Sequence, residues 1–399
     1  MNTPVARARW ATVAVLGSAQ TLAWASSYYL PAILAVPMAR DLGLATPLVF
    51  AAFSLSLVVA ALVGPAAGHA IDRHGGRPVL MLGNAVFAAG LLLLGSAQGP
   101  LSMCFAWALL GAAMGGGLYE AGFAALVRLY GHGSRNAITG ITLIAGFAST
   151  VGWPLSAWLE TRFGWRGACF VWAALHLLLG LPLNAMLPRA QPAASVAVPA
   201  AAASPVAAAP PLHRPRLSVA LLAYVFAATM FVSTAMATHL PQLLQAAGVT
   251  LAAAVGAGAL IGPAQVAGRL LEFGLLRRMH ALASARLAAL AHPLGAAALL
   301  LAGAPAAWPF ALLHGAGNGI MTIARGTLPL QLFGPQGYGV RQGWVTLPAR
   351  IAQAAAPFLF GLALQRWGAG ALWLSGVLGL SGFAALWLLP RAPSPDGRR

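Results

Sequence analysis

About twelve apolar stretches, each near 20 residues long, follow one another along the chain and are separated by short polar or Gly/Pro-marked breaks. A helix of about 20 apolar residues is long enough to span the hydrocarbon core of a bilayer. Only 7% of the 399 residues are charged and the mean hydropathy is +0.80, whereas soluble domains carry about 25% charged residues. The pattern therefore predicts an all-α integral membrane protein with twelve transmembrane helices.

The predicted spans fall into two sets of six, joined by a linker. The linker, residues 189–216, is rich in Ala and Pro and is expected to be flexible and cytoplasmic. It separates an N-terminal six-helix half, residues 1–188, from a C-terminal six-helix half, residues 217–399. The predicted spans are 11–36, 47–70, 78–97, 101–128, 136–159, 167–188, 217–240, 251–276, 283–303, 307–331, 343–365 and 370–390.

The two halves repeat each other at a shift of about 203–206 residues. Leu129-Tyr130-Gly131 is matched by Leu332-Phe333-Gly334, and Trp153-Pro154 is matched by Ala356-Pro357. Pseudo-symmetric halves related by an axis along the membrane normal are a plan used by transporters, with the binding site between the halves near mid-membrane. The repeat thus predicts where a site would lie.

The basic residues indicate topology. The chain has no lysine, and about sixteen of its 23 arginines fall in alternate loops and the termini. This positive-inside pattern places both termini in the cytoplasm and predicts a multi-pass protein of a bacterial-type inner membrane. Residues 1–25 resemble a signal peptide, with arginines before an apolar run. Because the apolar run continues beyond residue 25, an uncleaved first helix is expected. The net charge of +17 is therefore attributed to membrane topology. The expected partner of the protein is the lipid bilayer, and no nucleic acid is expected to bind.

The stretch GHAIDRHGGRP lies in the expected cytoplasmic loop after the second predicted span. Its Gly68, Asp72, Arg73, Gly75 and Arg77 follow the spacing G-x-x-x-D-R-x-G-x-R, which resembles the signature of the major facilitator superfamily. The resemblance implies a conformational latch, so these residues are expected to gate rather than to contact substrate. Gly68 is expected to allow close helix approach, and Asp72 to accept hydrogen bonds from helix N-termini or a neighbouring arginine.

The matching loop of the second half is degraded. Phe273 or Gly274 stands in place of the first glycine, and Arg277 or Arg278 in place of the aspartate. A latch in that half must use different partners.

Other signatures separate branches of the superfamily. Trp107 and Leu110 replace an arginine and a glutamine that proton-coupled drug exporters often carry, which weighs against drug export without excluding it. Residues 115–147 and the Gly268-Arg269 pair resemble the oxalate/formate-antiporter and monocarboxylate-porter branch. That branch holds carboxylates with basic residues in spans 8 and 11, which implies this role for Arg269 and Arg350.

Charged residues inside the predicted spans are the main functional candidates: Glu120, Glu272, Arg269, Arg325 and Arg350. A cation at the centre of a span costs roughly 2.5–3.5 kcal/mol on insertion scales, so a functional role is the default. Glu120 and Arg325 are near-equivalents in the repeat. We expect the three arginines to form an anion site, because a guanidinium suits carboxylates, with Glu120 as the titrating member.

A second interpretation of the same charges is structural. Glu120 and Arg325 could form an inner-gate salt bridge, Arg269 and Glu272 could form an intrahelical ion pair, and Arg350 could extend toward the cytoplasm. The sequence does not decide between binding and gating.

Polar residues on the expected cavity-lining spans complete the candidate set. His239 and His314 are candidate titrating groups, whereas His176 and His292 are expected to be hydrogen-bonded packing residues. The aromatic side chains that could shape the cavity are Trp24, Tyr28, Tyr29 and Tyr119. The polar side chains within two turns of Arg325 are Asn318 and Thr322.

The sequence therefore predicts a secondary transporter that moves a small organic solute by alternating access. A monocarboxylate or other organic anion is the best guess, with protons as a candidate coupling ion and a monomer as the expected functional unit. Two alternatives stay open: proton-driven efflux of an amphipathic compound, and a non-transporting membrane receptor. No enzyme, metal or cofactor is expected, because no nucleophile–base or metal-ligand cluster emerges and a nucleotide-binding loop needs a lysine that this chain lacks.

Overall fold

The computed structural model describes residues 4–130, 134–189, 215–274, 281–333 and 338–389, and within these ranges all regular structure is helical. The first group of helices comprises α1 (Pro4–Ser26), α2 (Pro31–Asp41), α3 (Thr46–His74), α4 (Gly76–Gly95), α5 (Pro100–Gly117), α6 (Tyr119–Tyr130), α7 (Arg135–Ala145), α8 (Ala148–Leu175), a π-helical turn at His176–Gly180 and α9 (Leu181–Ala185). The second group comprises α10 (Pro215–Ala246), α11 (Leu251–Ala259), α12 (Ile261–Gly274), α13 (Ala281–Ala302), α14 (Ala307–Phe333), α15 (Tyr338–Trp367) and α16 (Leu372–Leu388), with 3₁₀ turns at Ala304–Ala306 and Gly368–Ala371.

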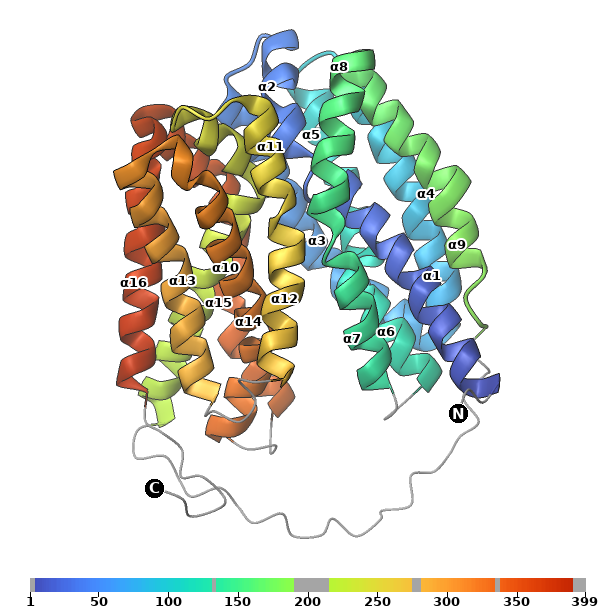
Figure 1. The fold of residues 1–399 in the computed structure, drawn as a ribbon. Coiled ribbons are helices and arrows are strands. Elements are labelled where there is room, and N and C mark those ends of the chain that lie inside the picture. The colour runs from blue at the N-terminus through green and yellow to red at the C-terminus, as the bar shows by residue number, and fades with distance from the viewer. Residues whose placement is uncertain (1–3, 131–133, 190–214, 275–280, 334–337, 390–399) are drawn as a thin grey trace, which may run out of the picture.

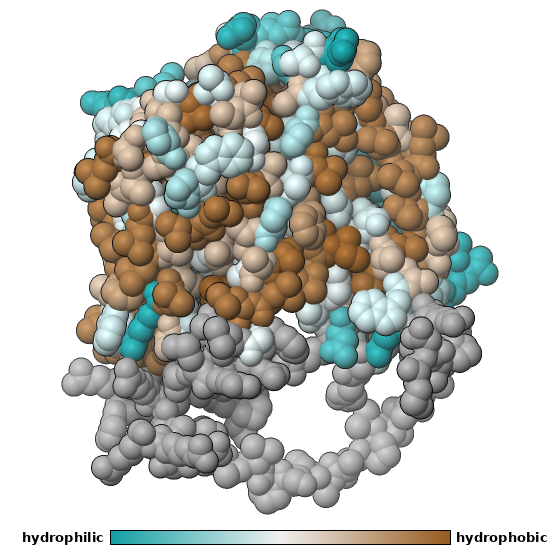
Figure 2. All heavy atoms as spheres, viewed as in Figure 1, coloured by the Kyte–Doolittle hydropathy of each residue, from teal (hydrophilic) through white to brown (hydrophobic). Residues whose placement is uncertain are grey.

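The two groups form two bundles that stand side by side (Figure 1). The bundles converge at the end where α2 and α11 lie, and they diverge at the opposite end, where α1 begins and α16 ends. Most of the predicted linker lies outside the described residues, so its boundaries and the pseudo-symmetry of the halves stay predictions. Figure 2 shows apolar side chains over most of the lateral surface and hydrophilic ones gathered toward the two ends, as a membrane-embedded bundle requires.

Nine segments of the described residues are long and apolar enough to cross a membrane. Two of them, Asn136–Ala185 and Val345–Leu388, contain 50 and 44 residues, about twice the length of one crossing. Each is divided by a positive-φ glycine, Gly164 at 68° or Gly368 at 55°. With these divisions, and with α14 as a further apolar helix, the fold accommodates the predicted twelve spans, a count that stays a prediction.

Four of the predicted continuous spans are interrupted along their length. The breaks lie between α1 and α2, at Leu118 between α5 and α6, at Gly146 and Phe147 between α7 and α8, and at Leu260 between α11 and α12. The sequence explains two of these breaks, since Pro31 begins α2 and a triple glycine ends α5. Leu118 has extended backbone at φ −87° and ψ −164°, whereas Gly146 and Leu260 keep helical dihedral angles. Non-helical backbone at membrane depth is tolerated where it is enclosed by protein or lines a cavity.

Glycines let the two bundles approach closely at the convergent end. A Cβ built on Gly258 of α11 would lie 2.2 Å from the Trp153 ring of α8, and one on Gly262 would lie 2.7 Å from the Gly146 carbonyl oxygen. Trp153 is fully buried, and its Nε1 donates to the Tyr29 carbonyl at 3.1 Å. Backbone contact of this kind needs residues without a side chain.

The latch motif forms the tight turn between α3 and α4. Gly75 has φ 85° and ψ 162°, a conformation essentially restricted to glycine. The expectation that Gly68 allows close helix approach is wrong in this conformation, because a Cβ there would meet no atom within 4 Å. The close contact falls instead at Gly76, whose Cβ would overlap Ala125 of α6. Asp72 is exposed, and no ion pair within the described ranges includes it. The second-half positions 277 and 278 lie outside the described residues.

Candidate functional site

A cavity of about 160 Å³ lies between the two bundles, and all four helix breaks contribute to it or adjoin it. Tyr28 and Tyr29 lie in the first break, Tyr119 follows the second, Gly146 lies in the third and Ile261 follows the fourth. Its charged lining residues are Arg269 from α12 and Arg325 from α14, and none of the described residues that line it is acidic. The cavity therefore presents two fixed positive charges to whatever enters it.

Arg269 reaches from one bundle to the other. Its Nη1 donates to the carbonyl of Thr142 in the last turn of α7 at 2.7 Å, and its Nη2 lies 3.5 Å from Oε1 of Gln265, one turn earlier on α12. The C-terminal end of a helix carries partial negative charge and stabilises a cation there. The Nε of Arg269 is buried and has no hydrogen-bond partner among the described residues. One donor of this guanidinium is therefore available to a ligand.

Arg325 lies on the face of α14 that lines the cavity. His314, Asn318 and Thr322 precede it at intervals of four and three residues, so that all four lie along one stripe of the helix. Its Nη1 donates to the sulfur of Met230 on α10. The two cavity arginines thus approach from neighbouring helices of the same bundle.

An aromatic wall from the N-terminal bundle faces these arginines. The ring centroids of Trp24 and Tyr119 are 4.9 Å apart, as are those of Trp24 and Tyr28. The Tyr28 hydroxyl lies 2.8 Å from Oγ1 of Thr234 on α10, and Gln353 of α15 donates to it at 3.4 Å. The Nε1 of Trp24 is buried without a hydrogen-bond partner in the described structure. The wall thus offers a second donor with no protein acceptor.

A second cavity of about 270 Å³ adjoins the first and shares Trp24, Tyr28 and Tyr119 with it. Glu120 and Arg350 line this second cavity, and Arg350 Nη2 donates to Glu120 Oε1 at 2.8 Å. The inner-gate pairing of Glu120 with Arg325 considered from the sequence is thus replaced by a pair with Arg350. The internal repeat predicted that Glu120 and Arg325 lie at a similar depth in the membrane. Which cation Glu120 meets depends instead on the helix opposite α6, and that helix is α15.

The remaining predicted residues lie in two locations. His314 and Asn318 line the first cavity. His239 lies outside the lining of both cavities, where its Nε2 donates to the Pro357 carbonyl at 2.7 Å and its ring packs 3.9 Å from that of Phe50. Neither ion pair found in the described structure joins Arg269 to Glu272, because the Arg269 guanidinium points across to α7 instead.

Sequence reasoning missed several lining residues, namely Met230, Ser233, Gln265 and Gln353. Two of them, Gln265 and Gln353, could have been found from the sequence. Gln265 stands four residues before Arg269, and Gln353 three residues after Arg350, so each shares a helix face with a predicted charge. Met230 and Ser233 lie in an apolar helix with nothing in its pattern to distinguish them.

Solved structures with the same fold cover nearly the whole chain. A bacterial homologue of the human lysosomal transporter Spinster, in an inward-facing and occupied conformation, matches with a TM-score of 0.70 at 14% identity, covering 97% of each chain. A mutant of the nucleoside transporter NupG matches with a TM-score of 0.75 at 12% identity, covering 96% of this chain and 100% of that one. A D-xylose–proton symporter matches with a TM-score of 0.69 at 14% identity, covering 98% and 99%.

No curated protein sequence matches the chain. At the identities above, the structural likeness establishes the fold alone.

The described residues form a multi-pass helical membrane protein with a polar cavity between two bundles, which is the architecture of a transporter. The sequence matches the Major Facilitator Superfamily over residues 16–313. The chain belongs to this superfamily.

Proposed function

We propose that the protein moves a small organic anion across the membrane by alternating access. The observation that carries the proposal is the pair Arg269 and Arg325 in one cavity whose lining contains no acidic residue. Arginine keeps its charge at any working pH, and charge removed from water needs a partner of opposite sign. Neither ion pair among the described residues includes Arg269, and a bound carboxylate would supply its partner.

The unpartnered donors support the same ligand chemistry. The Nε atom of Arg269 and the Nε1 atom of Trp24 are both buried donors with no acceptor among the described residues. A carboxylate has only acceptor oxygens and can take several hydrogen bonds at once. A neutral solute can accept these hydrogen bonds but brings no negative charge to the arginines, and a cation would be repelled by them, so the cavity favours an anion over either.

The volume of the first cavity indicates the size of solute that this cavity holds by itself. A cavity of about 150 Å³ holds one benzene molecule, and the cavity between the bundles measures about 160 Å³. A monocarboxylate or dicarboxylate with a small or single-ring body fits this space, and the aromatic wall of Trp24, Tyr28 and Tyr119 can pack against its apolar part.

We infer that Glu120 and Arg350 act as a gate between the bundles. Their side chains are 65% and 48% exposed, and exposed ion pairs contribute only about 0–1 kcal/mol. A contact of that strength can break at each transport cycle. The arginine bias of the loops supports cytoplasmic termini in an inner membrane, which would make the divergent end the cytoplasmic one.

Uptake into proteoliposomes tests the proposal. The probes are radiolabelled lactate, oxalate and benzoate, with benzamide as a neutral analogue and tetraphenylphosphonium as an amphipathic cation, each with and without a pH gradient. We expect flux of at least one carboxylate, and its loss in Arg269→Gln but not in Arg162→Gln, which removes a cation from an exposed position of α8. Flux of the neutral or cationic probe without any carboxylate flux would exclude an anion carrier.

A further inference from the structure

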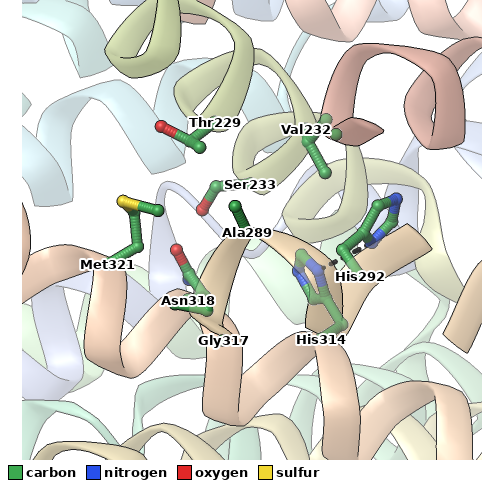
Figure 3. Close-up of a pocket in the computed structure, with 11 residues that line it drawn as sticks. Thr229, Val232, Ser233, Ala289, His292, His314, Gly317, Asn318 and Met321 are labelled. Carbon is green, nitrogen blue, oxygen red and sulfur yellow. Dashed lines mark hydrogen bonds between the residues drawn. The ribbon is translucent and has the colours of Figure 1, made fainter. Parts of the chain in front are cut away.

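Two buried imidazoles face each other inside the C-terminal bundle, beside the cavity between the bundles. Nδ1 of His292 on α13 lies 3.0 Å from Nδ1 of His314 on α14, with side chains 7% and 4% exposed (Figure 3). They line a small cavity of about 40 Å³ together with residues of α10, α14 and α16. His314, Ser233 and Asn318 also line the cavity that contains the two arginines. The pair therefore has one side in the bundle interior and one side toward the proposed anion site.

The geometry fixes the protons of the neutral pair. A hydrogen bond between two Nδ1 atoms needs one N–H and one lone pair, so a single proton lies between the rings. The ring that donates this proton has a bare Nε2, and the ring that accepts has a protonated Nε2. Nε2 of His292 is buried without a hydrogen-bond partner among the described residues. An imidazole expected to be a satisfied packing residue is thus left with one nitrogen unsatisfied, which a packing role does not require.

The pair can take up one further proton without losing its hydrogen bond. The proton binds the bare Nε2 of the donor ring, which becomes an imidazolium whose Nδ1–H still donates to the other Nδ1. A hydrogen bond from a charged donor is stronger than the neutral one. If the shared proton then moves to the second Nδ1, the second ring can release its own Nε2 proton. One proton enters at one ring and one proton leaves from the other, so the number of protons on the pair is unchanged. Each ring ends in the tautomer that the other ring had at the start.

The surroundings suit a transient cation. None of the residues that line the small cavity is formally charged: α10 contributes Thr229, Val232 and Ser233, and α16 contributes Gly379. Phe310 of α14 lies against both rings, with centroids 5.5 Å from His292 and 6.2 Å from His314, and an aromatic face attracts a cation.

The nearest charged side chains on the two histidine-bearing helices are both arginines. Arg286 of α13 donates to the Leu386 carbonyl of α16 at 2.9 Å, away from the pair, while Arg325 of α14 lies in the anion cavity. Of these two arginines only Arg325 shares a cavity with His314, and Arg269 of α12 lines the same cavity. No carboxylate among the described residues that line either cavity neutralises a proton on the pair.

We propose that His292 and His314 together form a proton-binding site that couples proton movement to the anion. The inference rests on the proposed function and extends it by naming the coupling ion and its carrier. A proton on the pair adds positive charge along the His314–Arg325 stripe of α14 and strengthens anion binding. By reciprocity, a bound anion strengthens proton binding to the same degree. Proton and anion would then travel in the same direction.

The proton site can be tested without knowing the substrate. The full chain, labelled with ¹⁵N-histidine and reconstituted in nanodiscs, is titrated by NMR, and the signals of the pair are identified by their loss in His292→Asn and His314→Asn. We expect one protonated and one bare Nδ1 at high pH, and a single proton taken up with both rings shifting together as pH falls. Two rings that stay neutral from pH 5 to 8, or that titrate independently, would overturn the proposal.

Coupling is tested with the carboxylate that the uptake experiment identifies, using a pH-sensitive dye inside the proteoliposomes. Asparagine places an amide near the Nδ1 position and cannot take a proton, so His292→Asn/His314→Asn is the decisive variant. His69→Asn, on an exposed turn of α3, is the matched control. Wild type and control should move about one proton per anion, with uptake changing about tenfold per pH unit below saturation. The double variant should move no proton, and any anion flux that it retains should not change with pH.

The two proposals fail differently. Anion flux without a pH change in wild type, or unaltered coupling in the double variant, removes the proton site and leaves the anion carrier intact. Absence of any carboxylate flux removes the anion carrier, and the NMR titration still decides whether the pair binds a proton.

Discussion

Arg350 of α15 donates to the carboxylate of Glu120 of α6 at 2.8 Å, and this ion pair joins the two bundles across the larger of the two cavities. If the pair is a gate, only the attraction between the two charges matters, so the acidic and the basic residue can exchange positions. Glu120→Gln or Arg350→Gln should lengthen the distance between spin labels placed at Val127 of α6 and Leu347 of α15, both exposed positions. Because exposed pairs are weak, we expect the population to shift by no more than about fivefold.

The charge-reversed double variant, Glu120→Arg with Arg350→Glu, is the control for that experiment, in a background where Cys104 and Cys169 are replaced. It should restore the wild-type distance distribution. A double variant further from wild type than either single change would show that the two residues do not act as a pair.

Close approach of α11 to α8 gives a second prediction. Gly258→Ala puts a methyl group 2.2 Å from the rigid, buried Trp153 ring, so the bundles can no longer meet at the convergent end. We expect the variant to populate a conformation open at that end and to transport slowly. Gly376→Ala in α16 meets nothing within 4 Å and should be neutral. Alkylation of a single cysteine introduced beside Trp153 reports the opening, and equal labelling of both variants would contradict the packing argument.

The two glycines of the latch motif should behave differently. Gly75→Ala forces a side chain into a backbone conformation that costs about 1–3 kcal/mol, whereas Gly68→Ala adds a methyl group to open space in this conformation. Thermal unfolding in detergent should show a lower midpoint for the first variant and an unchanged one for the second. Equal destabilisation by both substitutions would mean that Gly68 is packed in the resting protein.

The unpartnered donor of Trp24 makes a fourth prediction. Trp24→Phe keeps an aromatic ring in the cavity wall but removes Nε1, and a lost hydrogen bond to a charged ligand is worth about 1.5–3 kcal/mol, or roughly 10–150-fold in affinity. Trp107 is the matched control, since its Nε1 is also buried without a partner among the described residues but it lines neither cavity. Trp107→Phe should leave carboxylate affinity, measured by competition for uptake, unchanged. Equal losses in both variants would exclude a ligand role for Trp24.

The helical membrane fold and the arginines of the site were accessible from the sequence because both depend on local composition. Arg269 and Arg325 are conspicuous as charges in apolar spans. The partner of Glu120 was not accessible, because a carboxylate in one bundle meets whichever cation the opposite helix presents at its level. Nor was the contact of His292 with His314, which lie 22 residues apart on different helices.

The helix breaks form an intermediate case. Pro31 and the glycines at positions 115–117 were visible in the sequence, but a proline or glycine in a membrane span is often tolerated without a break. Tertiary packing around the cavity decides which of them interrupts its helix.

The claim that this cavity binds an anion through Arg269 is tested most directly by ligand-induced stabilisation of the purified protein. Ligand bound only to the folded state at 100 times its Kd stabilises it by about 2.7 kcal/mol. We predict that benzoate or another carboxylate of the panel raises the unfolding temperature of wild type and Arg162→Gln, that benzamide does not, and that Arg269→Gln abolishes the shift. Stabilisation by benzamide equal to that by benzoate, or an undiminished shift in Arg269→Gln, would contradict the account.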